Sequence, residues 1–166
     1  MSLRSPVRPR SLLTGCAVLA LGLAPLTAAP ADAAASSDSH LRVVSLEPEP
    51  APAGGETTVR AFVANEGPET TANPIKLTIN FPRGSFAAEP FFPPFPTCFP
   101  GMGGHSVTCT FPAGLRPGRT ATALIPAAVY ENTPVGTVLT GGAVTVSSPD
   151  DPNPMNNGAP FSIVVS

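Results

Sequence analysis

The fold class is decided by the stretch Ile75-Lys76-Leu77-Thr78-Ile79-Asn80-Phe81, in which apolar and polar residues alternate without a break. Successive side chains of a β-strand point to opposite faces of the sheet, so an alternation of period two is typical of a strand with one buried face. Residues 75–81 therefore predict a half-buried strand.

Similar strand-like runs recur on both sides of this stretch, and prolines and glycines punctuate the connections between them. Gly141-Gly142 interrupts one of these runs, where we expect a β-bulge, with a two-residue hairpin turn as the alternative. Seven short strands at this spacing predict an all-β fold, an Ig-like antiparallel β-sandwich that forms a single domain over residues 36–166. The predicted strands are 41–46, 57–65, 75–81, 106–111, 120–130, 137–147 and 161–165.

Residues 1–35 are expected to be a secretory signal peptide. Three arginines at the start precede an uncharged run over 12–27, and small residues follow it. The uncharged run is about 16 residues long, short of the roughly 20 that span a bilayer. We expect cleavage after Ala33 or Ala35.

The sequence Leu13-Thr14-Gly15-Cys16 offers a second interpretation, because it matches a bacterial lipobox that would place a lipid on Cys16. A lipobox lies at the end of the apolar run, whereas Cys16 lies near the beginning of this one. We therefore predict a secreted, extracellular protein with no membrane span after signal cleavage.

The composition excludes several classes of function. Only 12% of the 166 residues are charged, and residues 36–166 carry six basic and ten acidic side chains, a net charge of −4. This balance gives no basic surface for nucleic acid. The sequence also lacks a Gly-x-Ser-x-Gly nucleophile elbow, a zinc-ligand spacing and a glycine-rich phosphate loop. We expect no enzymatic activity and no cofactor.

Cys98 and Cys109 are the two cysteines that remain after signal cleavage. In an oxidising compartment such a pair forms a disulfide by default, and we predict one here. The alternative is a reactive thiol or a metal pair. Either would need a positive or histidine-rich setting, and only His105 lies nearby in sequence.

A segment rich in phenylalanine, proline and glycine covers residues 82–104 and is expected to be a loop. Exposed aromatic side chains on a proline-stiffened loop favour a contact surface, since they supply area at a low entropic cost. The alternative is that the rings fold back and cap the open end of the sandwich. The candidate contact residues are Phe91, Phe92, Phe95 and Phe99.

The turn over residues 150–157 is rich in side-chain oxygens, which are the ligands that calcium prefers. The competing interpretation is structural, because Asp and Asn stabilise turns by hydrogen bonding to nearby backbone. The spacing does not match an EF-hand loop, so calcium is the weaker of the two hypotheses. The oxygens belong to Asp150, Asp151, Asn153, Asn156 and Asn157.

Five short motifs together resemble a bacterial Ig-like family, the conserved repeat domain of unknown function in bacterial surface proteins. This family is similar to the bacterial cell-adhesion-related Ig-like domain. The resemblance implies an Ig-like fold in an extracellular setting, with no catalysis and no ligand to carry over. The single copy expected here departs from the family, whose members commonly occur in tandem. The segment 82–104 departs from the family, which has plainer sequence there. The motifs lie at residues 59–68, 81–84, 98 with 107–109, 115–118 and 150–157.

These observations predict a secreted, non-enzymatic Ig-like binding or structural module at the bacterial cell surface or in the medium. Its partner would be a protein or a cell-envelope polymer. The alternative function is that of a secreted protein inhibitor, which would present the segment 82–104 to a hydrolase.

Overall fold

The computed structural model describes residues 35–166. The predicted signal peptide and the lipobox cysteine Cys16 lie outside the described residues, except for Ala35 at the boundary. Along the described chain no helix is long and apolar enough to cross a membrane. The elements are β1 (Leu41–Leu46), β2 (Glu56–Asn65), β3 (Ile75–Asn80), β4 (Ser85–Ala87), β5 (Cys98–Pro100), η1 (Met102–Gly104), β6 (Ser106–Phe111), β7 (Thr120–Val129), β8 (Val138–Ser147), η2 (Pro154–Asn156) and β9 (Gly158–Val164).

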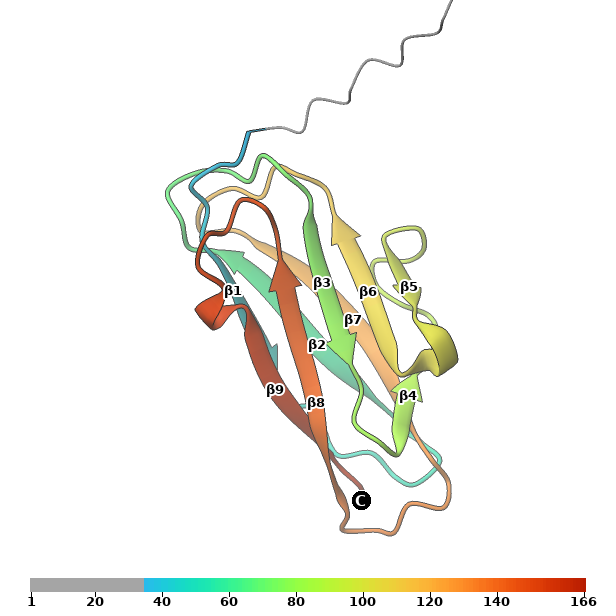
Figure 1. Cartoon of the computed structure of the whole chain (residues 1–166). Helices are drawn as coiled ribbons and strands as arrows, with labels where there is room; N and C mark the ends of the chain where they lie inside the picture. The colour runs from blue at the N-terminus through green and yellow to red at the C-terminus, as the bar shows by residue number, and fades with distance from the viewer. Residues whose placement is uncertain (1–34) are drawn as a thin grey trace, which may run out of the picture. The chain divides into compact units, whose positions relative to one another are not determined.

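The strands form two sheets that pack face to face (Figure 1). One sheet has the order β1-β2-β7-β4 and the other has the order β5-β6-β3-β8-β9. All named strand pairs are antiparallel. The predicted all-β antiparallel sandwich is therefore confirmed, with nine strands between residues 35 and 166 in place of about seven.

The alternation that predicted β3 matches its burial. Ile75, Leu77 and Ile79 are completely buried, whereas Lys76 and Asn80 are exposed. β3 pairs with β6 on one side and β8 on the other, so it lies in the middle of its sheet. Its apolar side chains meet those of β2 and β7 in the core between the two sheets.

The Gly141-Gly142 pair lies at the predicted β-bulge. The pairing of β8 with β9 shifts register between Leu139 and Gly142, and β8 continues as one strand on both sides. Gly142 cannot be replaced easily, because a Cβ there would lie 2.7 Å from the ring of Phe161. The alternative of a two-residue hairpin turn at this pair was therefore wrong.

The segment 82–104 contains the two strands that the sequence did not predict. β3 belongs to one sheet, β4 pairs with β7 in the other sheet, and β5 returns to the first sheet beside β6. Each of these strands is three residues long, which is too short for an alternation of apolar residues to be recognised. The expectation of a plain loop over 82–104 is corrected: this segment crosses from sheet to sheet and back.

Candidate interaction site

The segment from β4 to β5 covers one open edge of the sandwich. Beyond β4 it continues along β7, where Ala88 N–H donates to the carbonyl of Pro126 at 2.8 Å. Phe92 and Leu124 then exchange two backbone hydrogen bonds of 3.0 and 2.8 Å. Backbone pairing thus fixes the chain as far as Phe92, and the segment then crosses the edge to reach β5. Three of its peptide bonds are cis, those that precede Pro90, Pro93 and Pro96.

The four candidate contact residues do not share one environment. Phe91 is 8% exposed and belongs to the core, whereas its neighbour Phe92 is 56% exposed on the outer side. Phe95 is 79% exposed and Phe99, on β5, is 42% exposed. Phe91 therefore points inward while Phe92 points outward, because strand-like backbone turns adjacent side chains to opposite faces. A direct contact role for Phe91 stays a prediction. We call Phe92, Phe95 and Phe99 the aromatic edge.

A cavity of about 350 Å³ lies beside the aromatic edge. Its size is at the lower end of the range of sites that hold small molecules or inserted side chains. Among its lining residues Glu89 carries the only charge, and no ion pair of Glu89 occurs within residues 35–166. The cavity can therefore accept an apolar group together with a cation at its rim. The lining residues are Glu89, Pro90, Phe91, Pro94, Phe95, Cys98 and Pro100.

A disulfide between Cys98 and Cys109 holds β5 against β6 beside this cavity. The two cysteines are paired in register, their Cα atoms are 4.0 Å apart, and both side chains are fully buried. On either side of the bond, Thr110 N–H donates to the carbonyl of Thr97 and Gly101 N–H donates to that of Ser106, both at 2.8 Å. The bond therefore anchors the end of the segment that carries Phe99.

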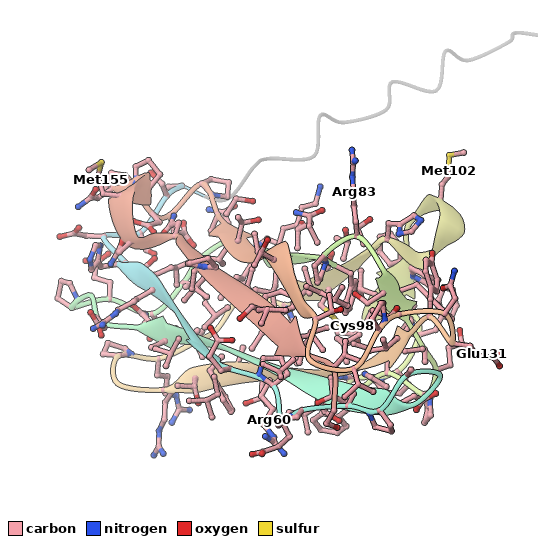
Figure 2. The ribbon with its side chains drawn as sticks, turned by 90° about the horizontal axis from the view of Figure 1, so that it is seen from below. Arg60, Arg83, Cys98, Met102, Glu131 and Met155 are labelled. Atoms are coloured by element: carbon pink, nitrogen blue, oxygen red, sulfur yellow. A yellow bond between two sulfur atoms is a disulfide. The ribbon has the colours of Figure 1, made fainter. Side chains whose placement is uncertain are left out.

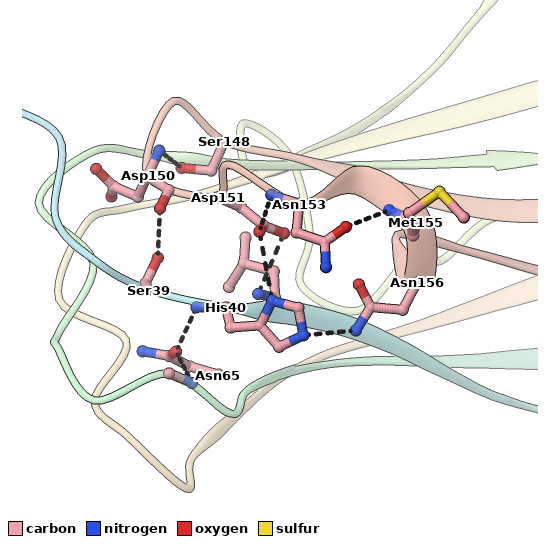
Figure 3. Close-up of polar contacts among 11 residues, drawn as sticks. Ser39, His40, Asn65, Ser148, Asp150, Asp151, Asn153, Met155 and Asn156 are labelled. Carbon is pink, nitrogen blue, oxygen red and sulfur yellow. Dashed lines mark hydrogen bonds and ion pairs between the residues drawn. The ribbon is translucent and has the colours of Figure 1, made fainter.

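The oxygen-rich turn between β8 and β9 lies against the chain that leads into β1 (Figure 3). The Asp150 carboxylate is fully buried and accepts hydrogen bonds from the backbone and side-chain N–H groups of Asn73, both at 2.7 Å. It also accepts from Ser37 N–H at 2.9 Å. Asp150 thus ties together three segments that are distant in sequence.

Burial alone would raise the pKa of Asp150. Hydrogen bonds from the side chain and backbone of Asn73, and from the backbone N–H groups of Ser37 and Ala72, favour the charged form and outweigh it. The net pKa of this carboxyl group therefore lies below its ordinary value of 3.8.

Asp151 contacts the same segment before β1, a few residues further along the sequence. Its carboxylate accepts from Leu41 N–H at 3.2 Å and from Asn153 N–H at 3.1 Å, and it lies 3.6 Å from His40 Nδ1. The other ring nitrogen of His40 is 3.0 Å from Asn156 Nδ2. These contacts agree with the structural interpretation of the turn, and sequence reasoning had no signal for His40 or Asn73 as partners.

The remaining oxygens proposed for calcium are arranged differently. Asn153 Oδ1 accepts from Met155 N–H at 3.3 Å, whereas the buried Oδ1 atoms of Asn156 and Asn157 have no hydrogen-bond partner. Over residues 35–166 no group of three or more His, Cys, Asp or Glu side chains is placed to hold a metal ion. Calcium binding at this turn stays a prediction.

No protein-family model matches the sequence, and no curated protein matches it either. The fold is similar to that of the third cohesin of ScaC from Acetivibrio cellulolyticus, solved in complex with the ScaB dockerin. That similarity has a TM-score of 0.53 at 16% identity and covers 75% of this chain and 99% of the cohesin. The fold is thus that of a cohesin-like β-sandwich, without an identified sequence family.

A second similar structure is BcpA, the major pilin subunit of Bacillus cereus. It has a TM-score of 0.52 at 13% identity, and the match covers 77% of this chain and 39% of the pilin. The chain therefore corresponds to less than half of that subunit. Identities this low show a shared fold alone.

Proposed function

We propose that this protein is a secreted, non-enzymatic β-sandwich module that binds a protein partner through the aromatic edge. The observation that carries the proposal is the exposure of Phe92, Phe95 and Phe99 on one segment, of which Phe95 lines a cavity of about 350 Å³ together with the charged Glu89. Exposed aromatic residues around a cavity are typical of interaction sites, since they lose apolar surface to water when a partner binds.

The similar folds support an associative role. The cohesin was solved in complex with a dockerin, and the pilin is a major subunit of a pilus. The disulfide supports an oxidising, extracellular location, which agrees with the signal peptide expected over residues 1–35. The proposal also keeps the resemblance to the bacterial conserved repeat domain and the absence of catalytic activity as expectations.

Immobilised protein and its variants should be incubated separately with cell envelope and with culture supernatant from the producing bacterium. We expect the double variant Phe95→Ser/Phe99→Ser to lose most of the retained partner. Met155→Ser is a matched control, because Met155 is 90% exposed in η2, on a different turn. Equal retention by the wild type, the double variant and the control would refute the aromatic edge as the binding surface.

The alternative function, inhibition of a hydrolase, is favoured by one observation. The segment 88–97 is held by backbone pairing to β7 at one end and by the disulfide at the other, so it presents its rings on a constrained chain. A constrained loop binds with a smaller loss of conformational entropy. Capture of a hydrolase at a one-to-one ratio, with loss of its activity, would favour this alternative over adhesion.

A further inference from the structure

The outer faces of the two sheets differ in chemistry. The face of β6-β3-β8 is polar, with Thr78, Thr108 and Thr145 aligned across three strands. On the opposite side of the sandwich, the outward positions of β7 are Thr122, Leu124, Pro126 and Ala128. An outer face of that composition is unusual for a sheet that meets only water, since outward positions of such sheets are normally polar.

Apolar residues recur across this sheet, although Arg42 on β1 and Glu56 and Arg60 on β2 also point outward. The register aligns Leu46 with Arg60, Arg60 with Leu124, and Leu124 with Phe92, so one row crosses every strand from β1 to the edge. Leu46 is 49% exposed and Phe92 is 56% exposed. In the next row Val44 of β1, 40% exposed, lies beside Phe62. We call the outward residues of β1, β2, β7 and the adjoining edge the apolar face.

Two charges of opposite sign lie on β2 within the apolar face, whereas the charge of this face on β1, Arg42, is paired with Glu66 at 3.2 Å. Glu56 and Arg60 are both outward residues of β2, two positions before and two positions after Thr58. Neither takes part in an ion pair within the part of the chain that the structure describes. Figure 2 shows Arg60 pointing away from the sandwich. The two charges are therefore placed symmetrically about Thr58 and are free to meet charges on another molecule.

We propose that the apolar face binds a second copy of this chain about a two-fold axis that crosses β2 at Thr58. The axis lies in the plane of the interface and runs perpendicular to the strands. Each residue of β2 then faces the residue of the other copy that lies equally far from Thr58 on the opposite side. Arg60 of one copy then faces Glu56 of the other. On β7 the same operation places Leu124 opposite Ala128 of the other copy.

The charges select this arrangement. An axis at Arg60 would place the two arginines against each other, and like charges in contact oppose association. The axis at Thr58 instead forms two Arg60–Glu56 pairs, which are equivalent by symmetry. It also places Pro126, the register partner of Thr58, opposite Pro126 of the other copy.

The size of the face fits a weak dimer. Strands lie about 4.8 Å apart and rise about 3.3 Å per residue, so the 6, 10, 10 and 3 residues of β1, β2, β7 and β4 cover about 460 Å². Two copies would bury about 900 Å² in total, which is below the range of stable interfaces and within that of weak, transient ones. This proposal does not depend on the aromatic edge, since only Phe92 belongs to both surfaces.

Sedimentation velocity on the purified secreted protein, at up to about 500 µM, tests the proposal, because interfaces below about 1,200 Å² are typical of weak complexes that form only at high concentration. We expect the wild type to form dimers as concentration rises. Arg60→Glu should weaken the dimer by at least about tenfold, since it places two acidic pairs in the interface. Glu56→Arg should have the same effect, and the exchanged pair Glu56→Arg/Arg60→Glu should restore dimerisation.

The matched control is Lys76→Glu, a charge reversal on the polar face of β3 that should leave the dimer unchanged. Circular dichroism melts of all variants verify that each remains folded. A wild type that stays monomeric over this range would overturn the proposal. Failure of the exchanged pair to restore a dimer would overturn it as well, even if both single variants dissociate.

Discussion

At the scale of single residues, the pair Phe91-Phe92 separates stability from recognition. Phe91 is in the core and Phe92 is on the surface, although they are neighbours in sequence. Phe91→Ala should lower the free energy of unfolding by about 3–5 kcal/mol, because it leaves a cavity in the core. Phe92→Ala should lower it by about 1 kcal/mol or less. Urea denaturation measures both values, and equal losses would contradict the placement of the two rings.

The buried Asp150 carboxylate should make the stability of the fold sensitive to acid. The folded pKa of Asp150 lies below its ordinary value, so the ionised group stabilises the fold above about pH 4. This stability is lost as the pH falls toward and through the folded pKa. Asp150→Asn should therefore cost about 2 kcal/mol at pH 7 and should reduce the loss of stability between pH 5 and pH 2, roughly the range of the transition.

Thermal melts across this pH range make the measurement. Asp38→Asn is the matched control, because the Asp38 side chain is exposed and its substitution should leave the pH profile of the wild type unchanged. A profile of Asp150→Asn that parallels the wild type at every pH would show that Asp150 does not provide this acid-sensitive stability.

At the scale of elements, the success of the sequence prediction depended on the length of each strand. β3 was recognisable because it is six residues long with one face in the core, so burial imposes an alternation on it. β4 and β5 were not recognisable, because three residues and frequent prolines leave no period to detect.

The candidate site was predictable only in part, for a related reason. The concentration of phenylalanines over residues 86–99 identified the segment that carries the aromatic edge. The position of Phe92 depends on its pairing with Leu124, which lies 32 positions further along the chain. No local pattern encodes a contact between residues so far apart, so neither the cavity nor the apolar face could be predicted.

The disulfide gives a prediction for β5. The bond joins cysteines 11 positions apart, and closing so short a ring in the unfolded chain should stabilise the fold by about 3 kcal/mol. The double variant Cys98→Ala/Cys109→Ala should lose about that amount. Its amide protons at Gly101 and Thr110, which bond across β5 and β6, should exchange faster with solvent.

Mass spectrometry without reducing agent provides the first measurement, since the intact bond lowers the mass by two hydrogens. Hydrogen exchange on the wild type and the double variant provides the second. Two freely alkylated thiols in the native secreted protein would contradict the bond itself. Unchanged protection at Gly101 and Thr110 in the variant would contradict its role in holding β5.

At the scale of the whole molecule, the chain that precedes β1 joins the two sheets. Ser37 N–H donates to Asp150 before β9, Asp38 N–H donates to Glu69 after β2, and His40 N–H donates to Asn65 at the end of β2. The residues that would follow signal cleavage are thus part of the folded domain, and both proposed cleavage positions leave them intact.

We therefore expect the secreted protein to begin at Ala34 or Ser36, which N-terminal sequencing would establish. A chain that begins at a lipidated Cys16 would support the lipobox instead. A variant whose mature chain begins at Leu41 should lose at least about 3 kcal/mol of stability. The removed residues donate N–H groups to Asp150, Asn65 and Glu69, and the His40 carbonyl accepts from Glu66 N–H. A variant that begins at Ser36 is the control, because Ser37 keeps its peptide N–H and these bonds are retained. Equal stability of the two variants would contradict the prediction, because it would mean that residues 37–40 contribute nothing to the stability of the sandwich.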